Sequence, residues 1–359
     1  MSLLDFQIEL SRKNLVKWIF LKGLSLIYAG LIHIWLAAYR FKIKNGWSAQ
    51  VSVISIGNIT LGGTGKTPMV DWLLSFLNEK EVIPAVLTRG YKAKRTEKLQ
   101  ILNQETSHKE DRVQFGDEPW LLFQNHPHIS LYISPDRIES ARQAQAQADI
   151  LILDDGMQHL RLNRDLEIIL IDSVSGIGNG KIFPLGPLRE PIQSLSRADV
   201  VVYTKSNLVP SQSIKDQICG HLREGVRHFD SEYLPSQLLS SAGKPPILPA
   251  SLENKKCLLF SGIGNPAGFT KTVSSTGALV QDHLIFDDHQ EYNSGTINRL
   301  KQFIDSCPYD YLICTEKDWV KLETWQSELR EVHRLKMKME IDPAFSNFLN
   351  NWFDQRAQI

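Results

Sequence analysis

The chain has 359 residues, 42% of them hydrophobic, which is enough for a sizeable core and favours two domains. Lys plus Arg balance Asp plus Glu at 40 each, so the sequence lacks the basic excess of a general nucleic-acid binder, and we expect no nucleic-acid partner. The four cysteines form no CxxC pair, which favours reduced thiols over a disulfide framework or a zinc site.

The N-terminal segment from Asn14 to Lys44 is apolar at its centre and basic at both ends. Its charge-free part, Gly23 to Tyr39, is at the short edge of the roughly 20 residues that span a bilayer, and its Trp and Tyr side chains suit a membrane–water interface. We therefore expect residues 1–47 to form a membrane-associating helical segment. The alternative is an ordinary buried helix. A signal peptide fits less well because no A-x-A-like cleavage site follows.

Short apolar runs alternate with helical patterns from residue 48 onward, and this alternation predicts a mostly parallel α/β sheet. We expect a first α/β domain over residues 48–207. Its expected strands are 51–56, 83–88, 129–134, 148–156, 166–173 and 198–206, and its expected helices are 67–80, 116–125 and 136–147.

The pattern weakens over residues 205–255, where the proline- and serine-rich run 234–251 indicates a connection between domains. Further α/β units at 256–273, 278–292 and 309–322, with a last helix at 343–355, predict a second, smaller α/β domain over residues 208–359. "SGIGNPAG" formally contains a dinucleotide-binding fingerprint, but Pro266 interrupts it, and we interpret it as a tight βα turn.

The first expected strand is followed by "GNITLGGTGKTPMV" (57–70). Its glycines allow the backbone to approach phosphates, and the helix start that follows favours anions. This is typical of a P-loop, in which Lys66 reaches the β- and γ-phosphates and Thr67 ligates Mg²⁺. The match is imperfect, since Thr60 stands at the first glycine position, and a plain glycine-rich turn is the alternative. The predicted nucleotide-binding residues are Gly62, Gly63, Thr64, Gly65, Lys66 and Thr67.

A P-loop needs a carboxylate on the magnesium side, and "ADILILDDG" supplies Asp154 and Asp155 at a strand end. The alternative is a strand-ending turn, and the pattern leaves open which of the two aspartates serves the metal. Guanine-binding P-loop proteins carry an Asp as the fourth residue of an [NT]-K-x-D motif. Because "TKSN" has Asn207 there, we favour ATP.

Three further motifs contain candidate functional residues. Asp117 of "GDEP" is a candidate proton acceptor or an ordinary helix start, and the residues alone leave the two interpretations equal. Arg189 of "PLGPLREP" is a candidate phosphate clamp or a surface ion pair. His289 of "DDH" has a neighbouring carboxylate that can fix its tautomer, although a lone Asp-His pair is more often a surface feature.

Together, and in this order along nearly the whole chain, the motifs resemble the tetraacyldisaccharide 4′-kinase family of Gram-negative bacteria. They are "GNITLGGTGKTP", "TRGYK", "GDEP", "DDGMQH", "PLGPLREP", "SGIGNP", "DDH" and "TEKD". The resemblance implies two α/β domains with the active site between them, at the cytoplasmic face of the inner membrane. It implies transfer of the γ-phosphate of ATP, with Mg²⁺, to the 4′-hydroxyl of a lipid-linked glucosamine disaccharide 1-phosphate, which gives lipid IVA.

The resemblance also implies roles for individual residues. Asp117 corresponds to the catalytic base, His289 to its partner and Glu190 to an active-site acid, while Lys66 serves the phosphates. Asp154 and Asp155 serve the metal and phosphate side together with Thr67. The candidates for anionic substrate groups are Arg89, Arg137 and Arg189. The expected partners are the lipid A disaccharide precursor and a membrane surface, with no obligate protein partner.

Two rival functions share parts of this pattern. A P-loop ATPase or GTPase that inserts a metal or cofactor into a partner accounts for the P-loop and "DDG", but leaves the N-terminal helix unexplained. A non-catalytic, membrane-bound nucleotide sensor would tolerate loss of Asp117.

Overall fold

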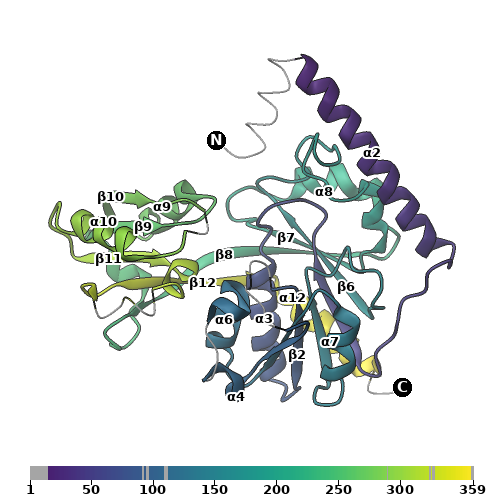
Figure 1. The fold of residues 1–359 in the computed structure, drawn as a ribbon, viewed down its shortest axis with the longest axis horizontal. Coiled ribbons are helices and arrows are strands. Elements are labelled where there is room, and N and C mark those ends of the chain that lie inside the picture. The colour runs from purple at the N-terminus through teal and green to yellow at the C-terminus, as the bar shows by residue number, and fades with distance from the viewer. Residues whose placement is uncertain are drawn as a thin grey trace.

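The computed structural model describes residues 15–90, 93, 97–108, 112–288, 290–322, 325 and 328–356, with side chains from residue 18 onward. Within these residues the strands form one 12-stranded sheet in the order β10-β9-β11-β12-β8-β7-β6-β1-β5-β2-β4-β3. Figure 1 shows a larger and a smaller lobe joined by β8 and β12. The chain thus has the expected architecture of a mostly parallel α/β sheet with a smaller α/β part and an N-terminal apolar helix.

The larger lobe has a parallel sheet, apart from β3, which runs antiparallel to β4. Its strands are β1 (Ser52–Gly57), β2 (Pro84–Thr88), β3 (Gln100–Leu102), β4 (Ser130–Ile133), β5 (Ile150–Asp154), β6 (Leu166–Asp172) and β7 (Val200–Thr204). Its helices are α3 (Lys66–Asn78), α4 (Gln104–Ser107), α5 (Arg112–Phe115), α6 (Asp117–Asn125), α7 (Arg137–Ala144), α8 (Gln212–Ile218) and α12 (Pro343–Arg356), with the 3₁₀ turns η1 (Ile192–Arg197) and η2 (Cys219–His221).

The smaller lobe continues the same sheet beyond the connecting strands. It contains β9 (Lys256–Ser261), β10 (Leu279–Ile285), β11 (Tyr311–Thr315), α9 (Pro266–Ser274), α10 (Ser294–Ile304), α11 (Glu316–Trp319) and the 3₁₀ turn η3 (Pro249–Leu252). The connecting strands are β8 (Arg227–Ser240) and β12 (His333–Ile341).

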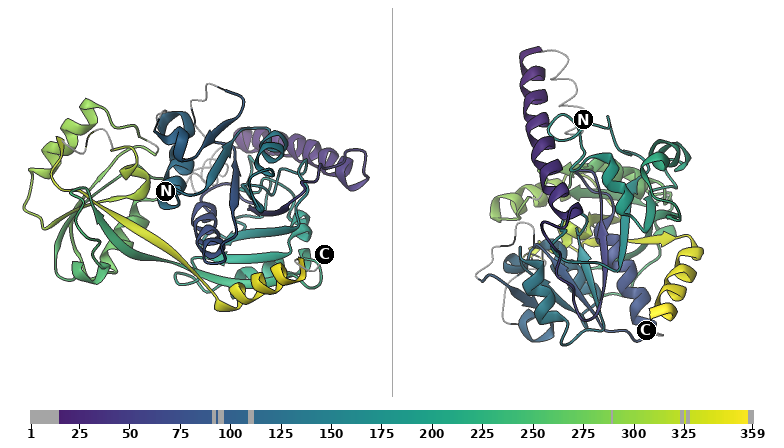
Figure 2. Two further views of the ribbon diagram at one scale, coloured as in Figure 1. Left: turned by 90° about the horizontal axis from the view of Figure 1, so that it is seen from below. Right: turned by 90° about the vertical axis from the view of Figure 1, so that its right-hand side faces the viewer.

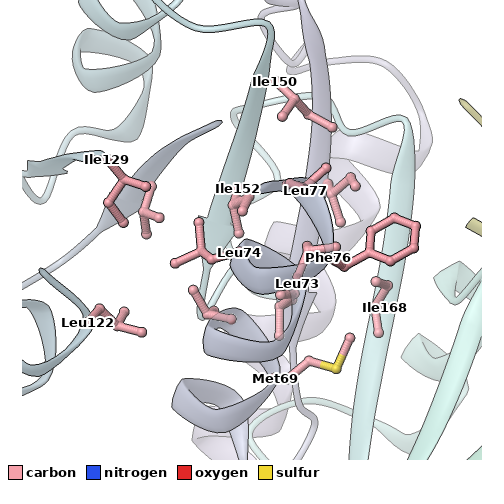
Figure 3. Close-up of a cluster of buried hydrophobic side chains, with 14 of the residues drawn as sticks. Met69, Leu73, Leu74, Phe76, Leu77, Leu122, Ile129, Ile150, Ile152 and Ile168 are labelled. Atoms are coloured by element: carbon pink, nitrogen blue, oxygen red, sulfur yellow. The ribbon is translucent and has the colours of Figure 1, made fainter. Parts of the chain in front are cut away.

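Apolar side chains cover both faces of the larger lobe's sheet, which explains why its strands are continuous hydrophobic runs. Ile54 and Ile152 pack under α3 and α6 on one face, whereas Val53 and Leu151 pack on the opposite face. Figure 3 shows the α3 side of this core. Because both faces of the sheet are covered, a ligand can reach it only at the strand ends. In open α/β sheets the ligand binds at the loops that follow the carboxyl ends of the strands.

Residues 205–255, where the sequence pattern is weak, contain the strand β8, which the sequence analysis did not predict, together with α8 and the 3₁₀ turns η2 and η3. β8 pairs with β7 in the larger lobe and with β12 towards the smaller lobe. The pairing shifts register where Lys336 opposes Gln237 and Met337 opposes Pro235, so Ser236 is an extra residue. A bulge is where a strand tolerates proline, because proline has no N–H to donate to the ladder.

The C-terminal helix α12 returns to the larger lobe, although it follows the smaller lobe in sequence. Phe345 is fully buried, and its ring lies 5.2 Å from that of Trp72 and 5.0 Å from that of Phe229. Residues 208–359 are therefore shared between both lobes in space. The domain boundaries 1–47, 48–207 and 208–359 remain a proposal about folding units.

The N-terminal helix α2 (Leu15–Arg40) projects beyond the body of the molecule (Figure 2). By length and composition, residues Trp18–Arg40 form the one helix among the described residues that is apolar enough to cross a membrane, with a mean hydropathy of 1.7 and 6% of it buried. Phe20, Ile27 and Ile34 are each more than 60% exposed. Such an exposed apolar helix is compatible with membrane association.

The packing of α12 generates a stability prediction. Phe345→Ala removes a fully buried ring from the larger lobe, and we expect the free energy of unfolding to fall by about 3–5 kcal/mol. Gln355→Ala, at an exposed position of the same helix, is the matched control and should change it by less than about 0.5 kcal/mol. Urea denaturation followed by circular dichroism measures both. A loss below about 1 kcal/mol for Phe345→Ala would show that α12 does not belong to this core.

Candidate active site

The P-loop links β1 to α3 at the carboxyl end of the sheet, in the strand–loop–helix context that the sequence predicts. Gly62 and Gly65 have positive φ values of 110° and 89°, which favour glycine. A Cβ added at Gly62 or Gly63 would meet no atom within 4 Å, so the loop is open on its outer side. Gly65 lies against Thr204 of β7, whose hydroxyl donates to the Thr64 carbonyl at 3.0 Å.

Lys66 begins α3 and points towards two acceptors. Its Nζ donates to Asn58 Oδ1 at 3.2 Å and lies 3.6 Å from Asp155 Oδ1. The Thr64 hydroxyl is buried and has no hydrogen-bond partner among the described residues. An unsatisfied buried hydroxyl beside a lysine and an open glycine loop suits an oxygen-rich ligand such as a polyphosphate.

Asp154 is the last residue of β5 and Asp155 follows it, directly beside the P-loop strand β1. The turn needs two close approaches: a Cβ at Gly57 would lie 2.5 Å from Met157 Cβ, and one at Gly156 would lie 2.2 Å from the Ser55 hydroxyl. Glycine at both positions lets the aspartate turn pack against β1. This brings the two predicted carboxylates to the P-loop, as the sequence analysis expects.

The two aspartates differ in their electrostatic surroundings. Burial, together with the neighbouring charges of Glu118 and Asp155, raises the pKa of Asp154 to about 6, although Thr88 donates to it at 2.9 Å. Burial acts in the same direction on Asp155, but the charges of Lys66 and Arg189 outweigh it and hold the pKa of Asp155 below its usual value. A buried carboxylate beside other carboxylates is the environment expected of a cation site.

Arg189 belongs to the P-loop side of the site. One of its guanidinium nitrogens donates to both Asp155 oxygens, at 2.8 and 3.0 Å. Its loop is fixed to the P-loop by two backbone hydrogen bonds, from Arg189 N to the Ile59 carbonyl at 2.8 Å and from Leu61 N to the Pro187 carbonyl at 2.7 Å. This placement supports a phosphate-side role for Arg189 rather than contact with a remote group of the acceptor.

Glu190, predicted to be an active-site acid, is fully buried beneath the aspartate turn. Its carboxylate pairs with Arg197 at 2.7 Å, and Arg197 donates to the Met157 carbonyl at 3.2 Å. Arg164 binds the carbonyls of Gly156 and His159 in the same way, at 3.1 and 2.8 Å. In this conformation Glu190 therefore supports the turn that carries Asp155 and has no surface to present to a substrate.

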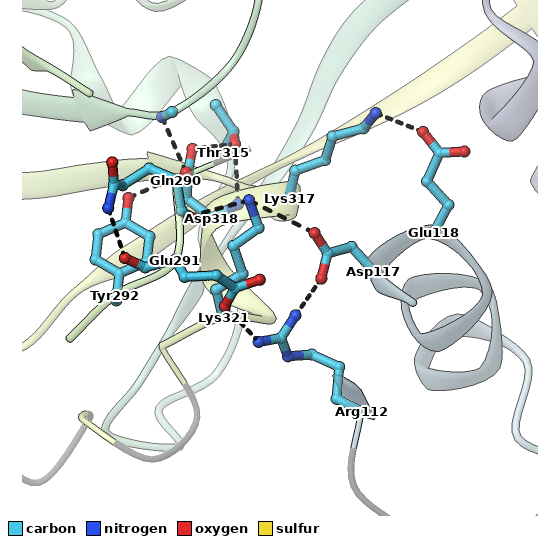
Figure 4. A network of polar contacts seen from close by, with 11 residues as sticks. Arg112, Asp117, Glu118, Gln290, Glu291, Tyr292, Thr315, Lys317, Asp318 and Lys321 are labelled. Carbon is cyan, nitrogen blue, oxygen red and sulfur yellow. Dashed lines mark hydrogen bonds and ion pairs between the residues drawn. The ribbon is translucent and has the colours of Figure 1, made fainter. Parts of the chain in front are cut away.

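Asp117 and Glu118 are the first residues of α6, and both meet cations (Figure 4). Arg112 pairs with one oxygen of Asp117, and Nζ of Lys321 lies 3.5 Å from the other. Glu118 accepts a hydrogen bond from Lys317 at 2.6 Å. Because α6 lies in the larger lobe and both lysines lie in the smaller lobe, the site contains residues from both.

The remaining predicted residues fall in different places. Arg89 is exposed at the end of β2, beside Thr88, and remains a candidate for an anionic group. Arg137 is 5% exposed and donates to the Ser134 carbonyl at 2.8 Å, which supports a structural role. His289 lies outside the described residues. The described neighbour Asp288 helps to raise the pKa of Lys317, so Asp288 lies on the same side of the site as Lys317.

The sequence analysis missed three cations of the site, namely Arg112, Lys317 and Lys321. The "TEKD" motif was the available signal, since it contains Lys317 and precedes Lys321 by three residues. We included that motif only in the family resemblance and assigned no role to its lysine.

The raised pKa of Asp154 predicts a pH-dependent cost in stability. The folded protein binds this proton more tightly than the unfolded chain, so stability falls as pH rises from 3.8, the ordinary pKa of an aspartate, to about 6. Asp154→Asn cannot ionise and removes that cost. We expect the nucleotide-free variant to gain up to about 3 kcal/mol in unfolding free energy at pH 7.5 and only about 1 kcal/mol at pH 4.5.

Urea denaturation at the two pH values measures this gain. Asp216→Asn, which removes a carboxylate at an exposed position, controls for the loss of one negative charge. An equal or larger gain at pH 4.5 than at pH 7.5 would contradict the assignment of Asp154 as a destabilised buried carboxylate.

Comparisons with known proteins indicate one family for nearly the whole chain. A family model described as "Tetraacyldisaccharide-1-P 4'-kinase" matches residues 17–354. A tetraacyldisaccharide 4′-kinase from Desulfatibacillum aliphaticivorans is 33% identical over 343 residues, covering 92% of this chain and 91% of that one. One from Syntrophus aciditrophicus is 35% identical over 304 residues, covering 82% and 81%.

Among solved structures, LpxK from Aquifex aeolicus, in an "apo" form in complex with ATP, matches with a TM-score of 0.74 and 28% identity. The match covers 92% of this chain and 98% of that one. The sequence relatives and the solved structure thus indicate the same family over almost the whole length of the chain. The chain belongs to the tetraacyldisaccharide 4′-kinase family and is a P-loop kinase.

Proposed function

We propose that this kinase transfers the γ-phosphate of ATP to the 4′-hydroxyl of a tetraacylated glucosamine disaccharide 1-phosphate, which forms lipid IVA. The observation that carries the proposal is that the charge of one carboxylate pair, Asp117 and Glu118, acts on the other pair, Asp154 and Asp155. Glu118, next to the predicted base Asp117, is close enough to help raise the pKa of Asp154 beside the P-loop. This supports a single site for the phosphate donor and for the group that activates the acceptor.

ATP is the substrate of the P-loop in this proposal. The open glycine loop and the unsatisfied Thr64 hydroxyl suit its phosphates, and Lys66 supplies a positive charge that Asn58 and Asp155 already orient. Arg189 holds Asp155 from the other side. Positioning and charge neutralisation are the main requirements of phosphoryl transfer, and these residues supply both.

The site also offers ligands for Mg²⁺. Thr67, Asp154 and Asp155 offer the oxygen ligands that this ion prefers. The described residues contain no group of three His, Cys, Asp or Glu side chains able to hold a metal by themselves. That agrees with an ion that depends on nucleotide phosphates and water for its other ligands. When bound, Mg²⁺ would neutralise charge that develops on the transferred phosphate.

Asp117 serves as the proton acceptor in this proposal. The 4′-oxygen forms a bond to the γ-phosphorus, the bond from that phosphorus to the β,γ-bridging oxygen breaks, and ADP leaves. The hydroxyl proton passes to Asp117, with His289 as its proposed partner. Glu190 acts as a positioning residue beneath the aspartate turn, and Arg89 is the remaining candidate for an anionic group of the acceptor.

The N-terminal helix explains how the enzyme would reach a lipid acceptor in a membrane. We propose that α2 holds the enzyme on the cytoplasmic face of the inner membrane of a Gram-negative bacterium, with no obligate protein partner. Ser25 donates to the Ile182 carbonyl at 2.7 Å, and Tyr28 donates to the Arg189 carbonyl at 3.1 Å. The helix is thus anchored on the loop that carries Arg189, which brings the site near a lipid held at the membrane surface.

A radiolabel assay tests the proposal. Purified protein is incubated with Mg²⁺, γ-labelled ATP and detergent-dispersed tetraacyl disaccharide 1-phosphate. We expect label to enter a bis-phosphorylated lipid, with a loss of at least about a hundredfold in both Lys66→Ala and Asp117→Asn. Lys80→Ala, at an exposed position near the end of α3, is the control and should retain activity.

Two outcomes would overturn the proposal. Label released only as free phosphate, with or without lipid, would favour an ATPase that acts on a partner. Full lipid phosphorylation by Asp117→Asn would remove Asp117 from the mechanism.

A further inference from the structure

The "TEKD" segment of the smaller lobe is held rigidly against the neighbouring turn. Thr315 caps the short helix α11 and donates to Asp318 Oδ2 at 2.6 Å. The other oxygen of Asp318 accepts from the Gly262 backbone at 2.9 Å and from the Tyr292 hydroxyl at 3.0 Å. Asp318 itself is fully buried, so its role is to fix α11 to the turn after β9. The backbone that carries Lys317 and Lys321, on either side of Asp318, is therefore held in place.

Lys321 carries a buried ammonium to the edge of the larger lobe. Its side chain is 1% exposed, and its Nζ donates to the Gln290 carbonyl at 3.2 Å. Figure 4 shows this ammonium directed at the carboxylate of Asp117, whose Oδ2 lies 3.5 Å away. A buried ammonium is costly unless it is paired. Its carboxylate partner comes from the opposite lobe.

The other contacts around Asp117 leave it little freedom. Arg112 occupies its second oxygen and also binds Glu291 at 3.2 Å. Beside it, Lys317 pairs with Glu118. Burial alone would lower the pKa of Lys317, but Glu118, Asp288 and Asp117 outweigh burial and raise it, so the lysine stays charged. Each of the two adjacent carboxylates of α6 thus meets a lysine of the smaller lobe.

We propose that Lys321 is a positioning residue for phosphoryl transfer: its buried ammonium fixes the orientation of Asp117 across the lobe interface, and Lys317 does the same for Glu118. This inference rests on the proposed function, in which Asp117 accepts the acceptor's proton. Lys321 takes no part in bond making. Without it, Asp117 keeps only Arg112, and its free oxygen can turn away from the acceptor.

Steady-state kinetics of Lys321→Met test the proposal, because methionine keeps an unbranched chain and removes the charge. We expect kcat for lipid phosphorylation to fall about a hundredfold, the effect of a misplacement of about 1 Å, with KM for ATP within twofold of the wild type. Lys321→Arg should recover at least a tenth of the wild-type kcat, since it restores a cation. Lys338→Met, which changes a surface lysine of the connecting strand β12, is the control and should be fully active.

The double variant Lys321→Met/Asp117→Asn should be no slower than Asp117→Asn alone, because residues that act through one another are not additive. A kcat within threefold of the wild type for Lys321→Met would overturn the inference. So would a loss that tracks a fall in melting temperature and is not rescued by arginine. If Lys321→Met does not fold, Lys317→Met, which changes a half-exposed side chain, takes its place, and a wild-type kcat there counts equally against the inference.

The single variant Asp117→Asn separates this inference from the proposed function. If it remains active, the base assignment fails together with everything built on it. If it is inactive while Lys321→Met is fully active, the proposed function stands and the positioning role alone is wrong.

Discussion

The antiparallel pair of β8 and β12 is the link on which the rest of the site depends. The P-loop, the aspartate turn and α6 belong to the larger lobe, whereas α11 and Lys321 belong to the smaller lobe. The two strands continue one sheet from lobe to lobe (Figure 1). Across the junction α11 lies opposite the start of α6, where Lys317 pairs with Glu118. The bulge at Ser236 lets the two strands change their pairing register while their hydrogen-bonded ladder continues. Contacts between the lobes then complete the arrangement.

Those contacts are mainly between opposite charges, which suits a site that must bind a highly charged substrate. The chain as a whole has no net charge, yet cations and carboxylates gather where the lobes meet. Below the aspartate turn, buried pairs such as Glu190 with Arg197 fix the backbone. Above it, half-buried pairs such as Lys317 with Glu118 stay close to solvent. Buried pairs specify geometry at some cost in stability, and exposed pairs can exchange partners more easily.

The parts that the sequence predicted are those with a local signal. The parallel strands are buried on both faces, so they appear as apolar runs, and the P-loop and aspartate turn are defined by a few adjacent residues. β8 was missed because only a few of its residues are buried and because it contains Pro235. The pairing of Asp117 with Lys321 joins residues 204 positions apart (321 minus 117), which no periodicity reveals. The pairing of Glu190 with Arg197 was not predicted, because it becomes visible only in the folded chain.

The central claim is that one site couples ATP to a lipid acceptor rather than to water. The ratio of ADP formed to lipid phosphorylated measures this most directly, with and without the tetraacyl disaccharide 1-phosphate. A coupled kinase gives a ratio close to one with the acceptor and almost no ADP without it. ADP that accumulates at the same rate in both reactions would contradict the account.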